Sequence, residues 1–553
     1  MFENYVNRTT FASYEDFKDN FVINVPENFN FAFDVVDIIA VDDPDRTALV
    51  WCNEADEEKI FSFADLSRAS NRAANYMREL GIGKGDAVML ILKRRYEFWI
   101  TFLALHKLGA IAIPATHLLT KKDITYRCNA ADIKMIISVD DERVIASVEN
   151  AEPDCPTLQR KIMLNTNRDG WLALDTVLDN YSDVFTRPSG SVGTSNDDIM
   201  LLYFTSGTTG LPKMVQHDYT YPLGHIITAG YWQCVQPGGL HLTVAETGWA
   251  KAVWGKIYGQ WLCKSAVFVY DFDRFEPHKL MQKVEKYKLT TFCAPPTIFR
   301  FLIKEDLTKY DLSCLKYCVV AGEPMNPEIY NAFLKATGIR IMEGFGQTET
   351  VVAVATYPWL EPKPGSMGKP SPLYDIDLLN DRGESCEVGE EGQIVIHTAS
   401  GKPVGMFNGY MRDDELTNSV WHDGIYYTGD MAWRDEDGYY WFVGRADDLI
   451  KTSGYRVGPF EVESALLEHP AVMECAITGS PDPVRGQVIK ATVVLTKGHT
   501  AGPEMVHELQ EHVKKVTAPY KYPRIIEFVT ELPKTISGKI RRVQIRESDN
   551  EIQ

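Results

Sequence analysis

The sequence predicts an α/β protein with more than one domain, and three observations support this. The chain has 553 residues, whereas a single hydrophobic core stops growing near about 250–300 residues. Short apolar runs rich in β-branched residues alternate with helical patterns over most of the length, which is typical of parallel α/β sheets. Near Gly365 the pattern changes to short alternating strands rich in Gly and Asp, and another unit begins after Gly444.

The part of the chain before Gly365 carries the α/β pattern. Strands are expected at residues 87–92, 110–114, 135–138, 201–204, 266–269, 290–293 and 317–320, and helices at 96–108 and 122–131. The most apolar long run, 98–115, is interrupted by His106 and Lys107. Such a run predicts a buried helix followed by a strand rather than a membrane span.

The rest of the chain predicts two smaller units. From Gly365 to about Gly444 we expect a β-rich subdomain with a strand at 393–397. After Gly444 we expect a helix at 459–469, strands at 472–478 and 488–495, a helix at 503–516 and a basic segment at 534–546. This last stretch of roughly 100 residues is long enough to form a domain of its own.

Charge and cysteine content exclude some classes of protein. The net charge of −19 argues against a general nucleic-acid-binding protein, because such binding needs clustered cations. The ten cysteines include no Cys-x-x-Cys pair and no zinc-ligand spacing, which fits reduced thiols. The N-terminus shows no basic region followed by an apolar core, the pattern of a signal peptide. We therefore expect a cytoplasmic protein without a membrane span.

Residues 203–213, Tyr-Phe-Thr-Ser-Gly-Thr-Thr-Gly-Leu-Pro-Lys, carry the strongest chemical signal. Gly207 and Gly210 let the backbone approach an anion closely, and the surrounding hydroxyl and backbone N–H groups can donate to phosphate oxygens. Lys213 adds a positive charge. A surface turn is the alternative, but six consecutive Gly or hydroxyl residues closed by Pro-Lys argue against it. A Walker loop is disfavoured, because Lys213 is followed by Met214 rather than by Ser or Thr.

Six motifs in order along the chain resemble those of adenylate-forming enzymes, the superfamily of acyl- and aryl-CoA synthetases, peptide-synthetase adenylation domains and firefly luciferase. They lie at residues 203–213, 322–324, 343–349, 426–430, 444–448 and 534–539. Each alone is only moderately specific, but six in order leave little room for coincidence. Residues 26–32 and 444–448 resemble the medium-chain acyl-CoA synthetases, so that the resemblance covers nearly the whole chain.

The resemblance implies a reaction in two steps and a division of the chain. A carboxylic acid attacks the α-phosphorus of ATP to give an acyl-adenylate and pyrophosphate, and coenzyme A then takes up the acyl group with release of AMP. A hinge at Asp447 would separate two domains. The N-terminal domain, 1–446, would hold two α/β sheet subdomains and the β-rich subdomain, 365–446. The C-terminal domain, 447–553, would be small, mobile and α+β.

The motif positions also imply which residues bind ATP or AMP. These are Thr205, Ser206, Gly207, Thr208, Thr209, Gly210, Lys213, Gly322, Glu323, Pro324, Glu343, Gly344, Phe345, Gly346, Gln347, Thr348, Asp430, Arg445, Arg456 and Lys539. Lys539 is implied to bridge the acid and the α-phosphate at the transition state, and Thr348 to donate to that phosphate. Glu349 is the implied Mg²⁺ ligand, with an ordinary helix N-terminal acid as the alternative. These three are the expected catalytic residues.

For the second step, the resemblance implies a domain rotation that removes Lys539 and brings the loop of Gly454 to the site. Glycine suits this loop, because a side chain would block a narrow tunnel for the pantetheine arm. The expected coenzyme A contacts are Ser453, Gly454, Tyr455, Arg485 and Arg524.

The acyl pocket is expected to be lined by Trp249, Trp254, Lys256 and Gly346. Acetyl-CoA synthetases have a bulky Trp before Gln-Thr-Glu, whereas this chain has Gly344-Phe345-Gly346 there, which argues against strict acetate specificity. Bulky aromatic residues on one helix after Trp249 would shorten the pocket. We therefore expect a short-to-medium fatty acid, straight or branched. Lys256 either lines this pocket or faces solvent, and the sequence leaves both open.

Two other functions stay open. One is an aryl-acid CoA ligase, and the other is a non-enzymatic adenine-nucleotide binding protein. Retention of Lys539, Thr348, Glu349 and Gly454 argues against the second, since a sensor needs no thiolation tunnel. The expected partners are a small carboxylic acid, ATP with Mg²⁺, and coenzyme A, with no nucleic acid. The chain is expected to be a monomer or a homodimer.

Overall fold

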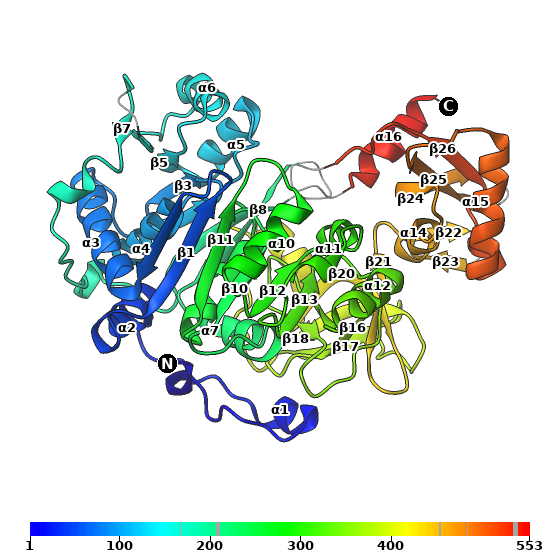
Figure 1. Cartoon of the computed structure of the whole chain (residues 1–553), viewed down its shortest axis with the longest axis horizontal. Helices are drawn as coiled ribbons and strands as arrows, with labels where there is room; N and C mark the ends of the chain where they lie inside the picture. Colours follow the sequence, from blue (N-terminus) through cyan, green and yellow to red (C-terminus); the bar gives the residue numbers. More distant parts are fainter. Residues whose placement is uncertain (166–167, 206–210, 453–454, 484, 535–539, 553) are drawn as a thin grey trace.

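The computed structural model of the chain describes residues 1–165, 168–205, 211–452, 455–483, 485–534 and 540–552 (Figure 1). These residues form a seven-stranded, a 14-stranded and a five-stranded sheet. Helices pack around the two larger sheets, and the five-stranded sheet lies apart with the C-terminal helices (Figure 1). The predicted α/β fold, with a large N-terminal part and a small C-terminal part, is confirmed.

The seven-stranded sheet has the strand order β7-β6-β5-β3-β4-β8-β9. Its strands are β3 (Ala87–Ile91), β4 (Ile111–Pro114), β5 (Ile133–Ser138), β6 (Arg160–Met163), β7 (Leu172–Ala173), β8 (Ile199–Thr205) and β9 (Lys213–Asp218). Helices α3 (Phe63–Glu79), α4 (Glu97–Leu108), α5 (Lys121–Ala131) and α6 (Glu142–Ala151) accompany it. Every residue of β3 is buried, as expected for a parallel strand covered on both faces.

The apolar run 98–115 forms the buried helix α4 and then β4, as predicted. Lys107 is buried at the end of this helix, where its ammonium group donates to Asp37 at 2.8 Å and to Asn71 at 2.6 Å. Among the described residues, no helix combines the length and apolar character that crossing a bilayer requires.

The 14-stranded sheet joins a parallel half to an antiparallel half. Its main path is β17-β18-β20-β21-β16-β15-β14-β13-β12-β10-β11-β1-β2, and β19 pairs with β20. The parallel half and its edge are β1 (Thr47–Asn53), β2 (Glu58–Ser62), β10 (Leu240–Thr243), β11 (Ala266–Asp271), β12 (Thr291–Ala294), β13 (Tyr317–Ala321) and β14 (Ile341–Phe345). The antiparallel half is β15 (Val354–Ala355), β16 (Ser366–Pro370), β17 (Asp375–Leu379), β18 (Gly392–His397), β19 (Trp421–His422), β20 (Ile425–Arg434) and β21 (Tyr440–Arg445).

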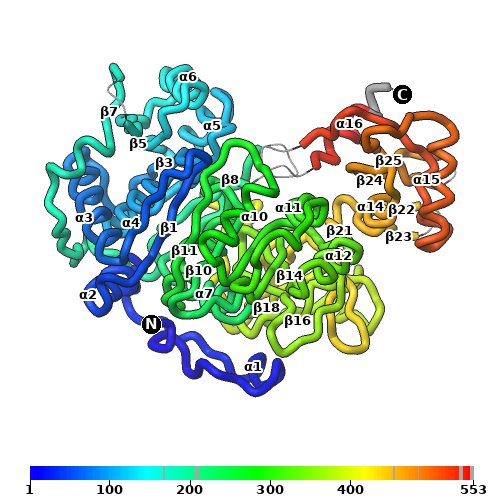
Figure 2. Tube along the Cα trace, in the orientation of Figure 1, coloured from blue at the N-terminus to red at the C-terminus, as the bar shows by residue number. Residues whose placement is uncertain are grey.

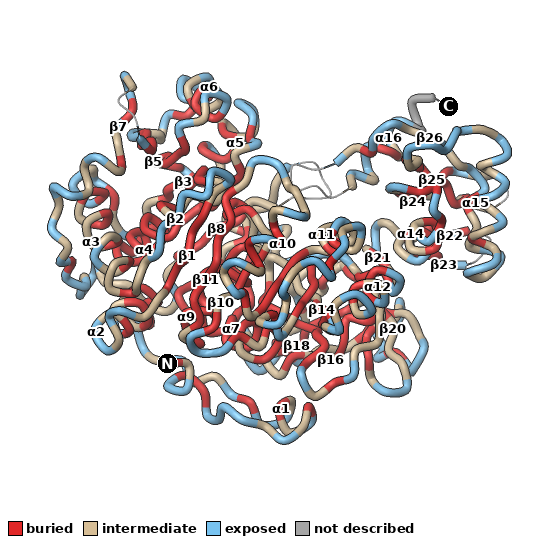
Figure 3. Tube along the Cα trace, viewed as in Figure 1, coloured by how far each residue is buried: buried red, intermediate tan, exposed pale blue. Residues whose placement is uncertain are grey.

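The β-rich stretch after Gly365 is thus continuous with the parallel sheet rather than separate from it. The short strand β15 pairs with β14 on one side and with β16 on the other. The smaller elements around the two large sheets are α1 (Tyr14–Asn20), α2 (Ile38–Asp42), α7 (Tyr221–Ile226), the π-helix η6 (Ile227–Trp232), α8 (Lys251–Lys256), α9 (Tyr258–Leu262), α10 (Pro277–Lys286), α11 (Pro296–Leu302), α12 (Pro327–Thr337) and α13 (Asp414–Val420). Figure 3 shows buried residues concentrated along the strands that these helices cover.

The C-terminal residues form a smaller unit with its own core. Its sheet has the order β23-β22-β25-β24, with β26 parallel to β25. The elements are β22 (Ile450–Thr452), β23 (Tyr455–Val457), α14 (Pro459–Leu467), β24 (Val472–Asp482), β25 (Gly486–Leu495), α15 (Pro503–Val516), β26 (Ile525–Phe528) and α16 (Arg542–Ile552). Val462, Leu466 and Leu509 lie in this core. The tube in Figure 2 shows the unit standing off one end of the molecule.

The N-terminal segment is tied to the antiparallel half of the large sheet. The Phe17 ring lies 4.7 Å from the Tyr231 ring and 5.1 Å from the Trp359 ring, measured between centroids. The Lys18 ammonium group donates to the carbonyl groups of Ser371 and Tyr374 at 2.9 and 3.0 Å. Aromatic packing therefore connects residues 14–21 to two segments far along the chain, around Tyr231 and Trp359.

Strand β9 is fastened to the segment 402–411 by a buried carboxylate. Asp218, which is 3% exposed, accepts from the Lys402 ammonium group at 2.8 Å and from the Asn408 amide at 2.9 Å. Beside it, the backbone N–H of Asn408 donates to Gln216 O at 2.8 Å. Burial raises the pKa of Asp218, but Lys402 and the hydrogen bonds outweigh this effect and hold that pKa below its usual value.

We expect Asp218→Asn to lower the free energy of unfolding by about 2–3 kcal/mol at pH 7, because it removes the charge that Lys402 faces. The lowered pKa means that this stabilisation is present above the ordinary value near pH 4 and is lost as the pH falls through the folded value. Urea unfolding at pH 7 and at lower pH measures both effects.

Asp179→Asn is the matched control, because Asp179 also pairs with a cation, Arg72, but is 86% exposed on its side chain. Its loss should change the free energy of unfolding by less than about 1 kcal/mol. A variant at Asp218 as stable as this control at pH 7 would contradict the structural role given to the Asp218–Lys402 pair.

Candidate active site

The two ends of the glycine-rich loop meet at the edge of the seven-stranded sheet. Thr205 ends β8 and Lys213 begins β9, and the two residues pair directly in the antiparallel register. The Lys213 ammonium nitrogen lies 5.1 Å from the centroid of the Tyr410 ring. Five of the predicted phosphate-binding residues lie outside the described residues, namely Ser206, Gly207, Thr208, Thr209 and Gly210.

Tyr410 connects this loop to the predicted catalytic motif. Its hydroxyl group donates to Glu349 Oε1 at 2.9 Å, and Glu349 O accepts from the backbone N–H of Phe407 at 2.8 Å. The neighbouring Thr348 O bonds the His217 ring at 2.8 Å, measured to Nε2. Lys213 and Glu349 are therefore gathered around one aromatic ring, although the sequence separates them widely.

A second cluster surrounds Asp430, which is 5% exposed on β20. Asp430 stands opposite Arg445 in the strand register, with 3.4 Å between Oδ1 and the guanidinium Nη1. The Gln347 amide group donates to the carboxylate of Asp430 and, at 2.8 Å, to Thr428 O. The Tyr426 hydroxyl in turn donates to Gln347 Oε1 at 2.8 Å. The predicted ribose site and the predicted catalytic motif are thus joined through Gln347.

The side chain of Glu343 is buried and bonds to the backbone, so it supports the site rather than facing a ligand. It is 6% exposed on β14, and its two carboxylate oxygens accept from the backbone N–H groups of Met325, at 3.1 Å, and Gly365, at 2.9 Å. Burial raises the pKa of Glu343 to about 8, against the lowering effect of these two hydrogen bonds. The predicted adenine loop, Gly322–Pro324, is therefore anchored from below at Met325.

The predicted adenine loop itself lies at the carboxyl end of β13. Gly322 has a φ of +104°, a conformation that favours glycine, and it is exposed together with Glu323. The ammonium group of Lys251 donates to Ala321 O beside the loop. The loop therefore combines an unusual backbone turn with an accessible surface.

Indole rings pack directly against the backbone of two glycines in the motif 343–349. A Cβ on Gly344 would come within 2.5 Å of Trp232, and one on Gly346 within 2.4 Å of Trp254. The two indole rings are perpendicular, with 6.1 Å between centroids, and Trp232 Nε1 donates to Glu343 O at 3.1 Å. Phe345 between them is half-buried against Phe442. Trp254 and Gly346, predicted for the acyl pocket, are in contact.

The region after Trp249 differs from the single helix expected. It forms two short helices, α8 and α9, because Ile257 between them has φ −143° and ψ −83°. Two close approaches accompany the break, since a Cβ on Gly255 would meet Thr243 Oγ1 at 1.8 Å and a Cβ on Gly259 would meet His225 O at 2.3 Å. Tight packing on both sides thus replaces a straight helix.

Lys256, at the end of α8, does not face solvent. Its side chain is 1% exposed, and its ammonium group donates to Ala245 O at 2.7 Å. Burial, with Arg94 nearby, lowers the pKa of Lys256 to about 7. The solvent-facing alternative is therefore wrong, because the break after Lys256 turns this side chain into the protein. Trp249 is half-buried at the start of the region.

The residues predicted for the hinge connect the two parts of the chain. Asp447 is exposed in a turn, with 3.6 Å between its Oδ1 and Arg445 Nε. The next residue, Asp448, accepts from the Arg546 guanidinium of α16 at 2.7 Å. Gly458 lies so close to β21 that a Cβ would come within 2.1 Å of Val443 O. Arg456, predicted at a phosphate, instead pairs with Asp381 in this structure.

The candidate coenzyme A residues are not brought together by the described contacts. Tyr455 is 51% exposed and stacks on Tyr520, with 4.1 Å between ring centroids. Arg485 donates its backbone N–H to Asp482 at 2.7 Å, and the Arg524 guanidinium donates to the Tyr522 hydroxyl at 2.6 Å. Three further predicted residues lie outside the described residues, namely Ser453, Gly454 and Lys539.

Glu349 is the one residue that the sequence predicts as a metal ligand. In the part of the chain that the structure describes, no group of three or more His, Cys, Asp or Glu side chains is arranged to hold a metal ion. Mg²⁺ commonly uses one or two carboxylates together with substrate phosphates and water. Glu349 fits that kind of site, because Tyr410 connects it to Lys213 at one end of the predicted phosphate-binding loop.

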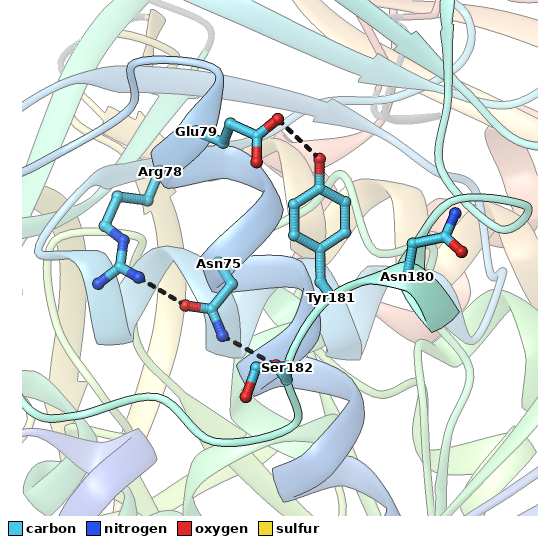
Figure 4. A pocket seen from close by; sticks show the side chains of 6 residues that line it. All are labelled: Asn75, Arg78, Glu79, Asn180, Tyr181 and Ser182. Atoms are coloured by element: carbon cyan, nitrogen blue, oxygen red, sulfur yellow. Dashed lines mark hydrogen bonds between the residues drawn. The ribbon is translucent and has the colours of Figure 1, made fainter.

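Sequence reasoning missed Tyr410, His217 and Trp232, three residues that organise the site. None stands inside a recognised motif, and each reaches the site from another segment of the chain. It also gave no hint of the polar surface pocket drawn in Figure 4, where the Asn75 amide donates to Ser182 O at 2.8 Å. No predicted site residue lines that pocket, so the clusters around Tyr410 and Asp430 remain the candidate active site.

Comparison with known proteins places the chain in one family. The family model of the AMP-binding enzyme matches residues 37–411, and that of the AMP-binding enzyme C-terminal domain matches residues 461–539. The chain is 41% identical to the human mitochondrial acyl-coenzyme A synthetase ACSM3, covering 98% of this chain and 94% of the relative. It is also 41% identical to the human mitochondrial acyl-coenzyme A synthetase ACSM5, covering 95% of this chain and 91% of that relative.

Solved structures resemble it over almost the same length. The anthranilate CoA ligase AuaEII, in complex with anthranoyl-AMP, has a TM-score of 0.86 and 28% identity, covering 96% of this chain and 98% of that one. An acyl-CoA synthetase of Brucella canis has a TM-score of 0.69 and 30% identity, covering 92% of each chain. The fold is therefore shared with CoA ligases and acyl-CoA synthetases over almost the whole chain.

The expectation of a cytoplasmic protein is wrong by the same comparison. The curated relatives ACSM3 and ACSM5 are mitochondrial proteins by name. The expectation rested on the lack of a signal-peptide pattern, which carries no positive information about the compartment.

The buried Glu343 generates a prediction about pH. Its raised pKa means that the folded protein binds a proton that the unfolded chain releases between about pH 4.5 and pH 8, so its contribution to stability falls as pH rises through that range. We expect Glu343→Gln to remove this dependence, so that the wild type loses stability relative to the variant by up to about 1.4 kcal/mol per pH unit. Urea unfolding from pH 5 to pH 8.5 measures it.

The control for this experiment is Glu328→Gln, a change at an exposed acid of the nearby helix α12. It should leave the slope of stability against pH as in the wild type. If stability depended on pH with the same slope in Glu343→Gln and in Glu328→Gln, Glu343 would not hold a proton in the folded state.

Proposed function

Because this chain belongs to the AMP-binding enzymes and, within them, to the acyl-CoA synthetases, we propose that it converts a carboxylic acid to its acyl-CoA in two steps. The acid and ATP give an acyl-adenylate and pyrophosphate, and coenzyme A then displaces AMP. The observation that carries the proposal is the junction at Gln347, whose amide group connects the carboxylate of Asp430 to the motif that ends in Thr348 and Glu349.

The Asp430 cluster suits the ribose of ATP. A carboxylate offers two acceptor oxygens to the two hydroxyl groups of a ribose. Gln347 and Arg445 orient the Asp430 side chain from two sides, and Thr428 supports it through a hydroxyl that accepts from Asp430 N at 3.1 Å. The adenine base would then lie toward Gly322–Pro324, the loop that Glu343 anchors.

Cations and donors gather where negative charge increases in the first step. Attack on the α-phosphorus brings two anions together, so positioned cations are the main catalytic requirement. Lys213 and Arg445 are the described cations near Glu349: Lys213 shares the contact with Tyr410, and Arg445 interacts electrostatically with the carboxylate. We propose that Lys539 joins them and that Thr348 donates to the α-phosphate.

Glu349 would hold Mg²⁺ together with the phosphates of ATP. The bound ion would neutralise phosphate charge during pyrophosphate release. The Tyr410 hydroxyl orients the carboxylate of Glu349 by donating to Oε1, which leaves its other oxygen to a metal ion. This part of the proposal rests on one carboxylate and on the chemistry that Mg²⁺ prefers.

For the second step we propose two domains, 1–446 and 447–553, that reorient about Asp447. Asp447 is exposed in a turn between β21 and β22, outside the strands of either part. Polar pairs such as Arg456–Asp381 join the two parts, and exposed pairs of this kind are weak. Reorientation would bring Ser453, Gly454 and Tyr455 to the adenylate, with Arg485 and Arg524 as contacts for coenzyme A phosphates.

The acid is proposed to be short to medium in length, straight or branched. Trp232 and Trp254 press against Gly344 and Gly346, so bulky rings occupy the space beside the motif. The perpendicular indole rings could also hold an aromatic ring, and the anthranilate CoA ligase shares this fold at 28% identity. An aryl acid is therefore the second candidate substrate. We propose a monomer or a homodimer as the active form.

Pyrophosphate release tests this function directly. It should be measured with ATP and Mg²⁺ across straight and branched acids of about two to twelve carbons and benzoate, each with and without coenzyme A. We expect an optimum among short-to-medium acids and sustained turnover only with coenzyme A. An optimum at benzoate would favour the aryl-acid ligase, and no acid-dependent release would contradict the synthetase proposal.

Lys539→Ala tests the division of the two steps. Removing one preorganised cation should slow adenylate formation by about 10²–10³-fold. Transfer of the acyl group from a synthetic acyl-adenylate to coenzyme A should stay close to the wild-type rate, because Lys539 leaves the site in that step. Stopped-flow measurement of each half-reaction separates the two effects.

Lys534→Ala provides the control, since Lys534 lies in the same segment but pairs with Glu474 at 2.8 Å. It should change both half-reactions by less than about threefold. Equal losses of the two half-reactions in Lys539→Ala would contradict the role given to Lys539.

A further inference from the structure

An imidazole and a carboxylate form a pair at the edge of the candidate active site, and no step proposed above uses it. His117 Nδ1 lies 3.2 Å from Glu246 Oε1. The same oxygen accepts from the backbone N–H of His117 at 3.2 Å, and Oε2 accepts from the Thr116 hydroxyl at 2.8 Å. The Glu246 carboxylate is thus held at both oxygens by residues 116 and 117.

The pair lies where the carboxyl ends of parallel strands from two different sheets meet. His117 follows β4 of the seven-stranded sheet, and Glu246 follows β10 of the 14-stranded sheet, each three residues past the strand end. The two segments are in close contact, since a Cβ on Gly248 would come within 2.4 Å of Thr116 N. In open α/β sheets, ligands bind at the carboxyl ends of the strands.

The residues after Glu246 connect the pair to the predicted substrate sites. Trp249, predicted for the acyl pocket, donates its backbone N–H to Glu246 O at 3.2 Å. Two residues later, the Lys251 ammonium group donates to Ala321 O beside the predicted adenine loop. His117 therefore lies beside the region between the proposed acyl pocket and the proposed nucleotide site, where an acyl-adenylate would have its carbonyl carbon.

His117 keeps an accessible ring nitrogen. Its side chain is 20% exposed, whereas that of Glu246 behind it is 7% exposed. Among the described residues, no hydrogen bond is made to Nε2 of His117. Other histidines of the N-terminal part are 0% exposed, so that none of their rings reaches the surface: His106, His217, His225 and His241.

Glu246 sets the tautomer of this imidazole. Burial raises the pKa of Glu246, but His117 and the Thr116 hydroxyl outweigh this effect, so that the pKa lies below its usual value and the carboxylate is ionised at pH 7. Arg94 and Lys256 also interact electrostatically with Glu246. An ionised carboxylate can only accept, so the neutral ring carries its proton on Nδ1 and presents a lone pair at Nε2.

Resting on the proposed synthetase function, we propose that His117 is the general base of the second step and that Glu246 positions it. His117 Nε2 takes the proton from the thiol of coenzyme A, and the sulfur forms a bond to the acyl carbonyl carbon. The bond from that carbon to the phosphate oxygen then breaks, and AMP leaves with the electron pair on that oxygen. The thiol needs a base, because only a small fraction of a free thiol is ionised at neutral pH.

His117→Gln tests this role, because glutamine keeps an N–H group that can donate to Glu246 but offers no basic nitrogen. Transfer of the acyl group from a synthetic acyl-adenylate to coenzyme A at pH 7 should slow by about 10²-fold or more, the usual contribution of a general base. Adenylate formation involves no thiol, so it should slow by less than about threefold. Single-turnover measurement of each half-reaction separates the two effects.

The pH dependence distinguishes a base from a residue that only supports the fold. Without the base, the thiolate has to form in solution, so the transfer rate of His117→Gln should rise about tenfold per pH unit from about pH 6 to pH 8. The wild-type rate should rise much less steeply. Glu246→Gln keeps the imidazole but loses the charge that fixes its tautomer, so transfer should slow by a smaller factor, about tenfold.

His278→Gln is the matched control, because His278 also lies beside a glutamate, with 3.7 Å between its Nε2 and Glu276 Oε2, but is 46% exposed on its side chain. It should keep both rates and the wild-type pH dependence. Transfer in His117→Gln as fast as in this control, or an equal loss of both half-reactions, would overturn the proposal. So would a wild-type transfer rate that rises about tenfold per pH unit over the same range. Each of these results leaves the synthetase function standing, whereas no turnover with coenzyme A and any acid would overturn both.

Discussion

The contact of two indole rings with a glycine backbone is the constraint on which the site depends. Gly344 and Gly346 lack side chains, so Trp232 and Trp254 can press against the end of β14. That contact holds the helices after β9 and β10 against the last parallel strand of the large sheet. The motif that continues to Glu349 therefore leaves the sheet at a defined point. Any side chain at either glycine would push an indole ring away and displace the motif with it.

The buried carboxylates around this point are paired, and the pairing explains their positions. Asp218 holds the segment that carries Tyr410, Glu343 anchors the loop at Met325, and Asp430 is oriented by Gln347. Each of these carboxylates is engaged from another segment of the chain, so that each fixes the relative position of two elements. A buried network of this kind rigidifies a site only where every member is satisfied.

The contacts between the N-terminal and C-terminal parts differ in kind from the contacts inside each part. The large sheets are joined by continuous strand pairing, from β14 through β15 to β16. The C-terminal sheet has its own core, and it meets the rest of the chain through the exposed ion pair of Arg456 with Asp381 and the close approach of Gly458 to Val443. Because each part has a core of its own, the proposed reorientation about Asp447 would leave both cores intact. That arrangement fits the two steps proposed above.

Local pattern alone determined most of the fold and the identity of the motifs. Strand and helix periodicity up to residue 321 and in the C-terminal unit reflects the faces that each element buries. The predicted phosphate loop and the predicted catalytic motif could be found because each is a single unbroken stretch of sequence. Only the tertiary structure decided that Lys256 is buried, that the helix after Trp249 breaks at Ile257, and that Tyr410, His217 and Trp232 belong to the site. The reason is physical: burial and partner choice depend on segments that meet only after folding, and no local pattern records which segments these will be.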